Sequence, residues 1–167
     1  MHGPDPTGID LPARAGPVPR TSRPRRGEPP TPHVQLTQNA PPELQEALLQ
    51  RAEALLGVTV GDSHVSVPDA RAFHLDGALA RGPAEAFQAG TEFAHLHPPY
   101  DGSLHLTLPP EVYRAVQAGG WGEPHPVSGT MMVFGPRDPA ELEVVWRLLL
   151  ASYRFARGDQ VEVERPS

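Results

Sequence analysis

The chain of 167 residues contains no cysteine, which excludes disulfide bonds, thiolate metal ligands and a cysteine nucleophile. Lysine is absent as well, so all 14 basic residues are arginine. Together with abundant Ala, Gly and Pro, this indicates a GC-rich, bacterial coding sequence. No apolar run approaches the ~20 residues of a membrane-spanning helix, and the N-terminus does not have the pattern of a signal peptide. We therefore expect a cytoplasmic protein with no membrane partner.

Residues 1–40 are rich in proline and lack apolar periodicity, which predicts a disordered tail. This stretch has five arginines against three acidic residues, a formal charge of +2, while the remainder has nine against 17, or −8. An acidic body lacks the clustered cations of a nucleic-acid-binding face, so no nucleic-acid partner is expected. We place one domain at residues 41–157 and a C-terminal tail at 158–167.

The pattern of the domain predicts an α+β fold, with a small antiparallel or mixed sheet and helices packed on one face. Apolar residues at helical spacing predict helices from Pro42 to before Gly57, from Pro110 to before Gly119, and from Pro139 through Leu150. Strands are predicted at 58–60, 64–67, 71–75, 93–97, 103–108 and 130–134.

The predicted hairpin of strands 93–97 and 103–108 separates histidines from leucines. His95 and His97 are two residues apart and share one strand face, while His105 lies on the same face of the next strand. If His97 pairs with Ser103 across the intervening turn, His95 falls opposite His105, with Cβ atoms roughly 5 Å apart. Burial of the leucine face fixes this register, since a slip of one residue would bury the imidazoles instead. The sequence thus predicts three imidazoles on one patch of one sheet.

A longer pattern surrounds these histidines. It comprises Glu92-Phe93-Ala94-His95-Leu96-His97, Asp101, Ser103-Leu104-His105-Leu106, Gly120-Trp121-Gly122, His125-Pro126 and Phe134-Gly135-Pro136-Arg137-Asp138. It resembles the luciferase domain of fungal luciferases, which numerous uncharacterised bacterial proteins share. The resemblance extends from about Leu44 to Tyr153. It implies an oxygenase-type reaction: fungal members oxidise a hydroxylated 2-pyranone, a hispidin derivative, with molecular oxygen and no known organic cofactor. This chain lacks their N-terminal hydrophobic membrane segment.

Two chemistries are open to the histidine cluster. His95, His97 and His105 could bind a divalent metal ion as a facial triad, with His125 or Asp101 completing the shell. Alternatively, one imidazole could deprotonate an acidic enol or phenol without a metal, oriented by Asp101, while another hydrogen-bonds the developing oxyanion. In either case no organic cofactor is expected.

The predicted catalytic residues are therefore His95, His97, Asp101, His105 and His125. Trp121, Arg137 and Tyr100 are predicted to bind the substrate. The function that follows is a luciferase-like oxygenase, or a related redox enzyme, acting on an acidic aromatic or pyranone-type small molecule. A non-enzymatic small-molecule-binding module and a metal-dependent hydrolase or isomerase remain alternatives. The sequence leaves the oligomeric state open.

Overall fold

The computed structural model describes residues 9–25, 27 and 32–159. Its main feature is a six-stranded antiparallel sheet with the strand order β3-β4-β5-β6-β8-β7. The strands are β3 (Val58–Asp62), β4 (Arg71–Leu75), β5 (Glu92–Leu96), β6 (Leu104–Leu106), β7 (Gly122–Pro124) and β8 (Met131–Val133). β1 (Thr21–Ser22) and β2 (Val34–Gln35) form a separate two-stranded sheet, and Ala84–Ala86 form a short 3-10 helix.

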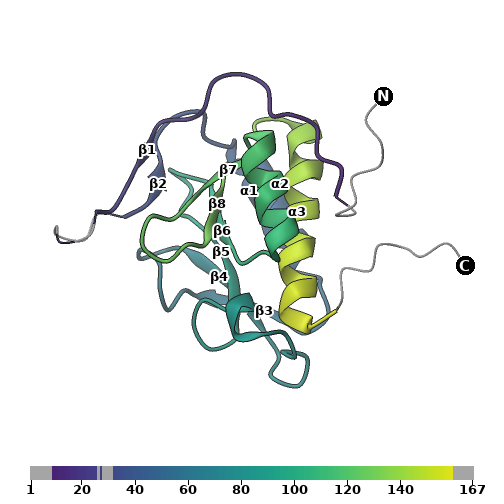
Figure 1. The fold of residues 1–167 in the computed structure, drawn as a ribbon. Helices are drawn as coiled ribbons and strands as arrows, with labels where there is room; N and C mark the ends of the chain where they lie inside the picture. The colour runs from purple at the N-terminus through teal and green to yellow at the C-terminus, as the bar shows by residue number, and fades with distance from the viewer. Residues whose placement is uncertain (1–8, 26, 28–31, 160–167) are drawn as a thin grey trace, which may run out of the picture.

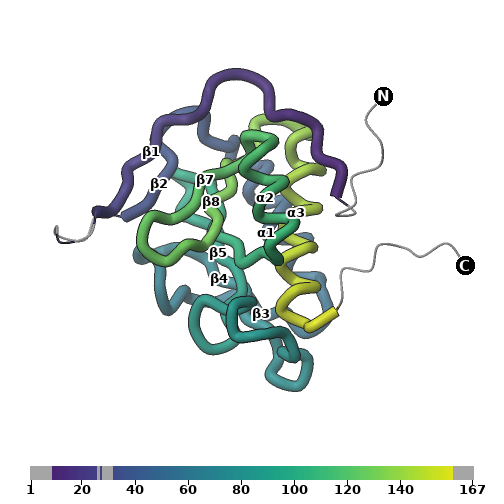
Figure 2. Tube along the Cα trace, in the orientation of Figure 1, coloured from purple at the N-terminus to yellow at the C-terminus, as the bar shows by residue number. Residues whose placement is uncertain are grey.

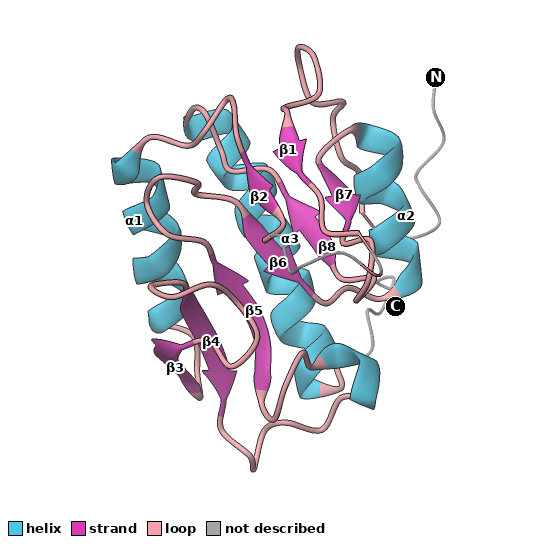
Figure 3. Ribbon diagram, turned by 90° about the vertical axis from the view of Figure 1, so that its left-hand side faces the viewer, coloured by secondary structure: helices cyan, strands magenta, loops and turns pink. Residues whose placement is uncertain are grey.

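Three helices lie together on one side of the six-stranded sheet (Figures 1 and 3): α1 (Pro42–Glu53), α2 (Pro110–Gly119) and α3 (Pro139–Arg157). α3 begins as predicted, since the Asp138 side chain accepts the Glu141 backbone N–H at 2.8 Å. The leucines of β5 and β6 are fully buried in one core with apolar residues of α3. The α+β prediction is confirmed. The leucine face of the sheet can be buried only if another layer covers it, and here the helices form that layer.

The strand predicted at 64–67 was wrong. Residues 64–66 form bends instead, because their backbone N–H groups bond to nearby side chains: His64 to Glu92, and Ser66 to Ser63. Conversely, β7 was not predicted; it begins directly after Gly120-Trp121 and pairs with β8. Glycine is required at position 122, since a Cβ there would lie 2.3 Å from the Met132 carbonyl oxygen.

The described part of residues 1–40 lies along the domain, which differs from the disordered tail that the sequence predicted. Figure 2 shows it running over the molecule from the helices to β1. Ile9 is buried in the core, and Trp121 donates its indole N–H to the Pro12 carbonyl at 2.6 Å. Leu11 also packs against the core. These are isolated apolar contacts and individual hydrogen bonds, so no periodic pattern in the sequence predicted them. The tail predicted at 158–167 lies outside the described residues from 160 onward.

Among the described residues, no helix combines the length and apolar character that crossing a membrane requires.

Candidate active site

β5, the residue that follows it and β6 place three histidines side by side on the sheet face opposite the helices. His95 pairs directly with His105, and the His97 backbone N–H donates to the Ser103 carbonyl at 2.9 Å. Both features are as predicted. All three side chains are buried. Their ring centroids are 4.7–5.3 Å apart.

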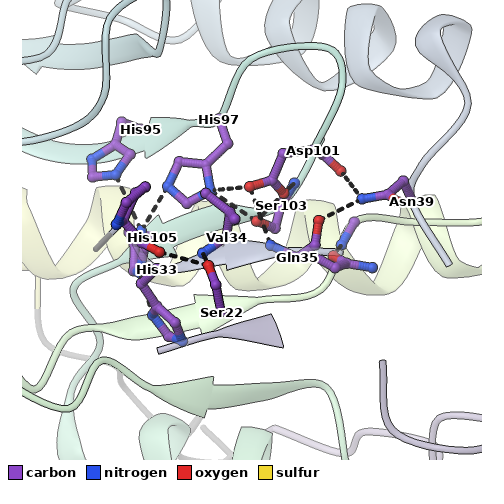
Figure 4. A network of polar contacts seen from close by, with 12 residues as sticks. Ser22, His33, Val34, Gln35, Asn39, His95, His97, Asp101, Ser103 and His105 are labelled. Carbon is purple, nitrogen blue, oxygen red and sulfur yellow. Dashed lines mark hydrogen bonds and ion pairs between the residues drawn. The ribbon is translucent and has the colours of Figure 1, made fainter. Parts of the chain in front are cut away.

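The ring nitrogens of these histidines converge on one another (Figure 4). His105 Nδ1 lies 3.0 Å from His97 Nε2 and 3.2 Å from His95 Nε2. One nitrogen from each ring falls within a common span of 4.8 Å. We call His95, His97 and His105 the histidine triad.

A bulge in β5 supplies the first carboxylate behind the histidine triad. The register with β4 passes from Phe73–Ala94 to His74–Glu92, which leaves Phe93 as an extra residue. The bulge turns Glu92 toward the histidine face, where its carboxylate lies 3.1 Å from His95 Nδ1. Burial alone would raise the pKa of Glu92, but hydrogen bonds from His95 and from the 63–64 segment outweigh it and lower that pKa.

Asp101 plays the corresponding part for His97. Its carboxylate lies 2.8 Å from His97 Nδ1 and also accepts the Ser103 hydroxyl. Asp101 is fully buried. The N-terminal segment, which is the described part of residues 1–40, holds Asp101 from the other side. The Gln35 backbone N–H donates to the carboxylate at 3.2 Å, and the Asn39 side chain donates to the Asp101 carbonyl at 2.8 Å.

His33 completes the arrangement from the N-terminal segment. Its Nδ1 lies 3.1 Å from His105 Nε2, and its Nε2 lies 2.7 Å from the Glu123 carboxylate. Arg23 also pairs with Glu123, at 2.7 Å. Burial alone would raise the pKa of Glu123, but hydrogen bonds from Thr21, Arg23 and His33 lower it. Sequence reasoning missed His33 and Glu123, because neither belongs to the hairpin and His33 lies in the Pro-rich stretch.

The hydrogen-bond partners determine which ring nitrogens carry protons. A carboxylate only accepts, so His95 Nδ1, His97 Nδ1 and His33 Nε2 each carry a proton. When the rings are neutral, His33 Nδ1 accepts a hydrogen bond from the Nε2–H of His105. His95 Nε2, His97 Nε2 and His105 Nδ1 are then lone pairs that face one another.

Burial favours the neutral form of His95, His33 and His105. It is the main cause of the lowered pKa values of His95 and His33, against which Glu92 and Glu123 act in the opposite direction. The hydrogen-bond partners of His105 are imidazoles rather than carboxylates. Electrostatic repulsion from these imidazoles lowers the pKa of His105 in addition to the effect of burial. The pKa of His105 therefore lies well below its ordinary value.

His125 lies beside the triad but is oriented differently. Its ring centroid is 5.5 Å from that of His105 and 5.2 Å from that of His33. Its Nδ1 accepts the backbone N–H groups of Val127 and Ser128, at 3.1 and 3.0 Å. The proton of the neutral ring is therefore on Nε2, so His125 offers a hydrogen-bond donor rather than a lone pair. Burial, followed by the neighbouring imidazoles, lowers its pKa.

A cavity of about 870 Å³ opens over the histidines. Five imidazoles line it: His33, His95, His97, His105 and His125. Its apolar lining includes Val65, Val67, Phe87 and Val127, and Arg25 contributes a positive charge. The structure therefore brings together the four histidines predicted from the sequence, adds His33, and places Asp101 behind His97.

The three predicted substrate-binding residues do not line this cavity. The Trp121 ring is buried in the core, and the Tyr100 side chain is exposed. Arg137 pairs with Glu141 at 2.6 Å and donates to the Ala15 carbonyl at 2.7 Å. The sequence does not show whether a side chain contacts the protein itself, the solvent or a ligand. The proposed site therefore includes none of these three residues.

Comparison with known proteins finds a family match that covers most of the histidine site. Residues 90–152 match the luciferase domain family. The match confirms the resemblance that the histidine motifs predicted, and it contains the whole triad with Glu92, Asp101, Glu123 and His125. The N-terminal segment that carries His33 lies outside it.

Three fungal luciferases illustrate the similarity. The luciferase of Armillaria ostoyae is 34% identical over 77 residues, which are 41% of this chain and 29% of that protein. The luciferase of Armillaria gallica is 32% identical over 81 residues, 43% and 30% of the two chains. That of Neonothopanus nambi is 31% identical over 77 residues, again 41% and 29%. The aligned region thus spans less than a third of these luciferases. No solved structure matches the chain.

Proposed function

We propose that this protein catalyses the oxygen-dependent oxidation of a flat, acidic aromatic or pyranone-type molecule, in the manner of a luciferase-like oxygenase. The observation that carries the proposal is the cavity whose floor is formed by the histidine triad. This floor lies in the part of the chain that is similar to luciferases. The resemblance implies the oxygen chemistry and the substrate class.

The cavity suits a ligand of this kind. Its volume of about 870 Å³ falls within the ~300–1,000 Å³ of small-molecule sites. Apolar side chains on its lining, including Val65 and Phe87, can pack against a flat ring. Arg25 and the Nε2–H of His125 would favour an oxygen that carries negative charge.

The histidines would prepare the substrate for oxygen. An unprotonated ring nitrogen of the triad can accept the proton of an acidic enol or phenol, and His125 can donate a hydrogen bond to the resulting oxyanion. Molecular oxygen then takes two electrons from the anion as a C–O bond forms. The proton returns to the distal oxygen, so substrate and oxygen add up to a hydroperoxide without an external reductant.

The test is oxygen consumption by the purified full-length chain with a panel of 4-hydroxy-2-pyranones and polyphenols. We expect turnover by the wild type and its loss in His97→Ala. His74→Ala serves as the control, since His74 bonds to the Asp62 carbonyl outside this cavity. Ligand binding without oxygen consumption would contradict the proposal and favour a non-enzymatic small-molecule-binding module. Turnover without oxygen would favour a hydrolase or isomerase instead.

A further inference from the structure

We propose that the histidine triad binds one divalent first-row transition-metal ion, through His95 Nε2, His97 Nε2 and His105 Nδ1. The inference rests on the proposed function only in taking this cluster to be the active site. A bound ion would occupy the three lone pairs, so it would take the place of the imidazole base described above and would promote ionisation of the enol or phenol as a Lewis acid. Its evidence is the hydrogen-bond geometry, and its test is metal binding, which can be measured without any substrate.

Lone pairs are in surplus at the centre of the triad. The far nitrogen of each ring has its proton committed to Glu92, Asp101 or His33, so in neutral rings the facing nitrogens have none to share. Buried acceptors without donors are costly, because the hydrogen bonds lost from water are not replaced. A cation among the three nitrogens removes this cost, since each lone pair then points at positive charge.

The spacing of the nitrogens also favours a bound metal ion. Metal–nitrogen bonds of about 2.0–2.1 Å at angles of roughly 90–110° place the ligand nitrogens about 2.9–3.4 Å apart. His105 Nδ1 lies 3.0 and 3.2 Å from the other two nitrogens, within this range, and all three nitrogens fall within 4.8 Å of one another. Two of the three pairs therefore already have the spacing of ligands on one face of an ion.

Negative charge is buried behind the triad. Glu92 and Asp101 are both fully buried, and their partners in this network are imidazole, hydroxyl and backbone N–H groups. Neutral donors lessen the cost of burying a carboxylate but do not cancel its charge. A divalent ion beyond the two imidazoles would balance both carboxylates.

Each ligand also has the support that metal-bound histidines usually show. A carboxylate that accepts the outer ring N–H fixes the tautomer and the ring orientation of His95 and of His97. For His105 the same task falls to His33, which is itself held by Glu123. The N-terminal segment is thus part of the proposed metal site.

The ligand set restricts the ion. Three imidazoles suit Zn²⁺, Cu²⁺, Ni²⁺ or Fe²⁺ rather than Mg²⁺ or Ca²⁺, which prefer oxygen ligands. The remaining coordination positions would face the cavity, since all three rings line it. His125 is not a ligand, because its Nδ1 is engaged and its Nε2 carries the proton.

The experiment is elemental analysis of the tag-free full-length chain, followed by removal of metal and titration with Co²⁺, whose visible absorption reports its ligands. We expect about one ion per chain, falling below roughly a tenth in His97→Ala and in His105→Ala. The matched control is His125→Ala, which removes an imidazole from the same cavity and should retain the ion. Glu92→Gln should weaken Co²⁺ binding about 10- to 100-fold.

Each outcome is decisive. Absence of metal from the wild type, together with no Co²⁺ binding, would overturn the inference and leave any oxygen consumption to metal-free acid–base chemistry. Equal retention of the ion by His97→Ala would place the metal elsewhere. If a variant fails to fold, as judged by circular dichroism, the wild-type stoichiometry and its Co²⁺ spectrum still decide whether a nitrogen-ligated site exists.

Discussion

The most informative perturbation of this structure is the replacement of His33 with alanine. The side chain is buried between His105 and Glu123, and the variant loses a contact to each, at 3.1 and 2.7 Å. The Nε2–H of His105 is left without its acceptor. Breaking such bonds inside a protein costs about 1–3 kcal/mol, and water entering from the cavity would replace part of the loss.

This loss should be visible in urea denaturation followed by circular dichroism. For a chain of this size it corresponds to a melting temperature lower by about 3–10 °C. Both wild type and variant are measured with a chelator present, so that metal binding does not enter the comparison. In a separate titration the variant should bind Co²⁺ about 10- to 100-fold more weakly.

His33→Gln is the matched control. Its amide oxygen can accept from His105, and its amide nitrogen can donate to Glu123, so it should recover much of the stability and of the metal affinity. If His33→Ala changes neither property, the contacts across the N-terminal segment do not support the triad. If His33→Gln is as damaged as His33→Ala, the volume of the ring matters rather than its two hydrogen bonds.

Three further predictions follow from the two faces of the sheet and from the contacts of its surroundings. Leu104→Ala should cost about 2–5 kcal/mol in urea denaturation through a buried cavity, and His97→Ala should cost less because its ring borders the open cavity; equal losses would make the imidazole structural. A chain that begins at residue 41 should melt at a lower temperature than the full chain in a thermal scan, since it lacks the core contact of Ile9 and the packing of His33; an unchanged melting temperature would contradict this packing. Burial alone would raise the pKa of Glu141, but its ion pair with an arginine outweighs this and lowers that pKa. The carboxylate therefore stabilises the fold above its unfolded pKa, so the stability difference between wild type and Glu141→Gln, measured in urea, should be present at neutral pH and shrink as the pH falls below about 4.

The sequence alone was sufficient for the hairpin at the centre of the site. Strict alternation places leucines and histidines on opposite faces, and burying the leucine face permits only one register. The pairing of His95 with His105, and the contact of Asp101 with His97, follow from residues at most ten positions apart. These contacts join residues that are close in the sequence, so the residue pattern predicts them without knowledge of the tertiary structure.

Tertiary structure alone decided what lies behind the histidines. His33 reaches His105 across 72 positions and Glu123 across 90, from a proline-rich stretch with no periodic signal. Glu92 would lie on the opposite face to His95 in a regular strand, and only the bulge at Phe93 turns it toward the ring. These partners fix the tautomers, and the tautomers create the three facing lone pairs. Which residues form the cluster was therefore a matter of local alternation, while its chemistry depends on long-range contacts that only the folded chain brings together.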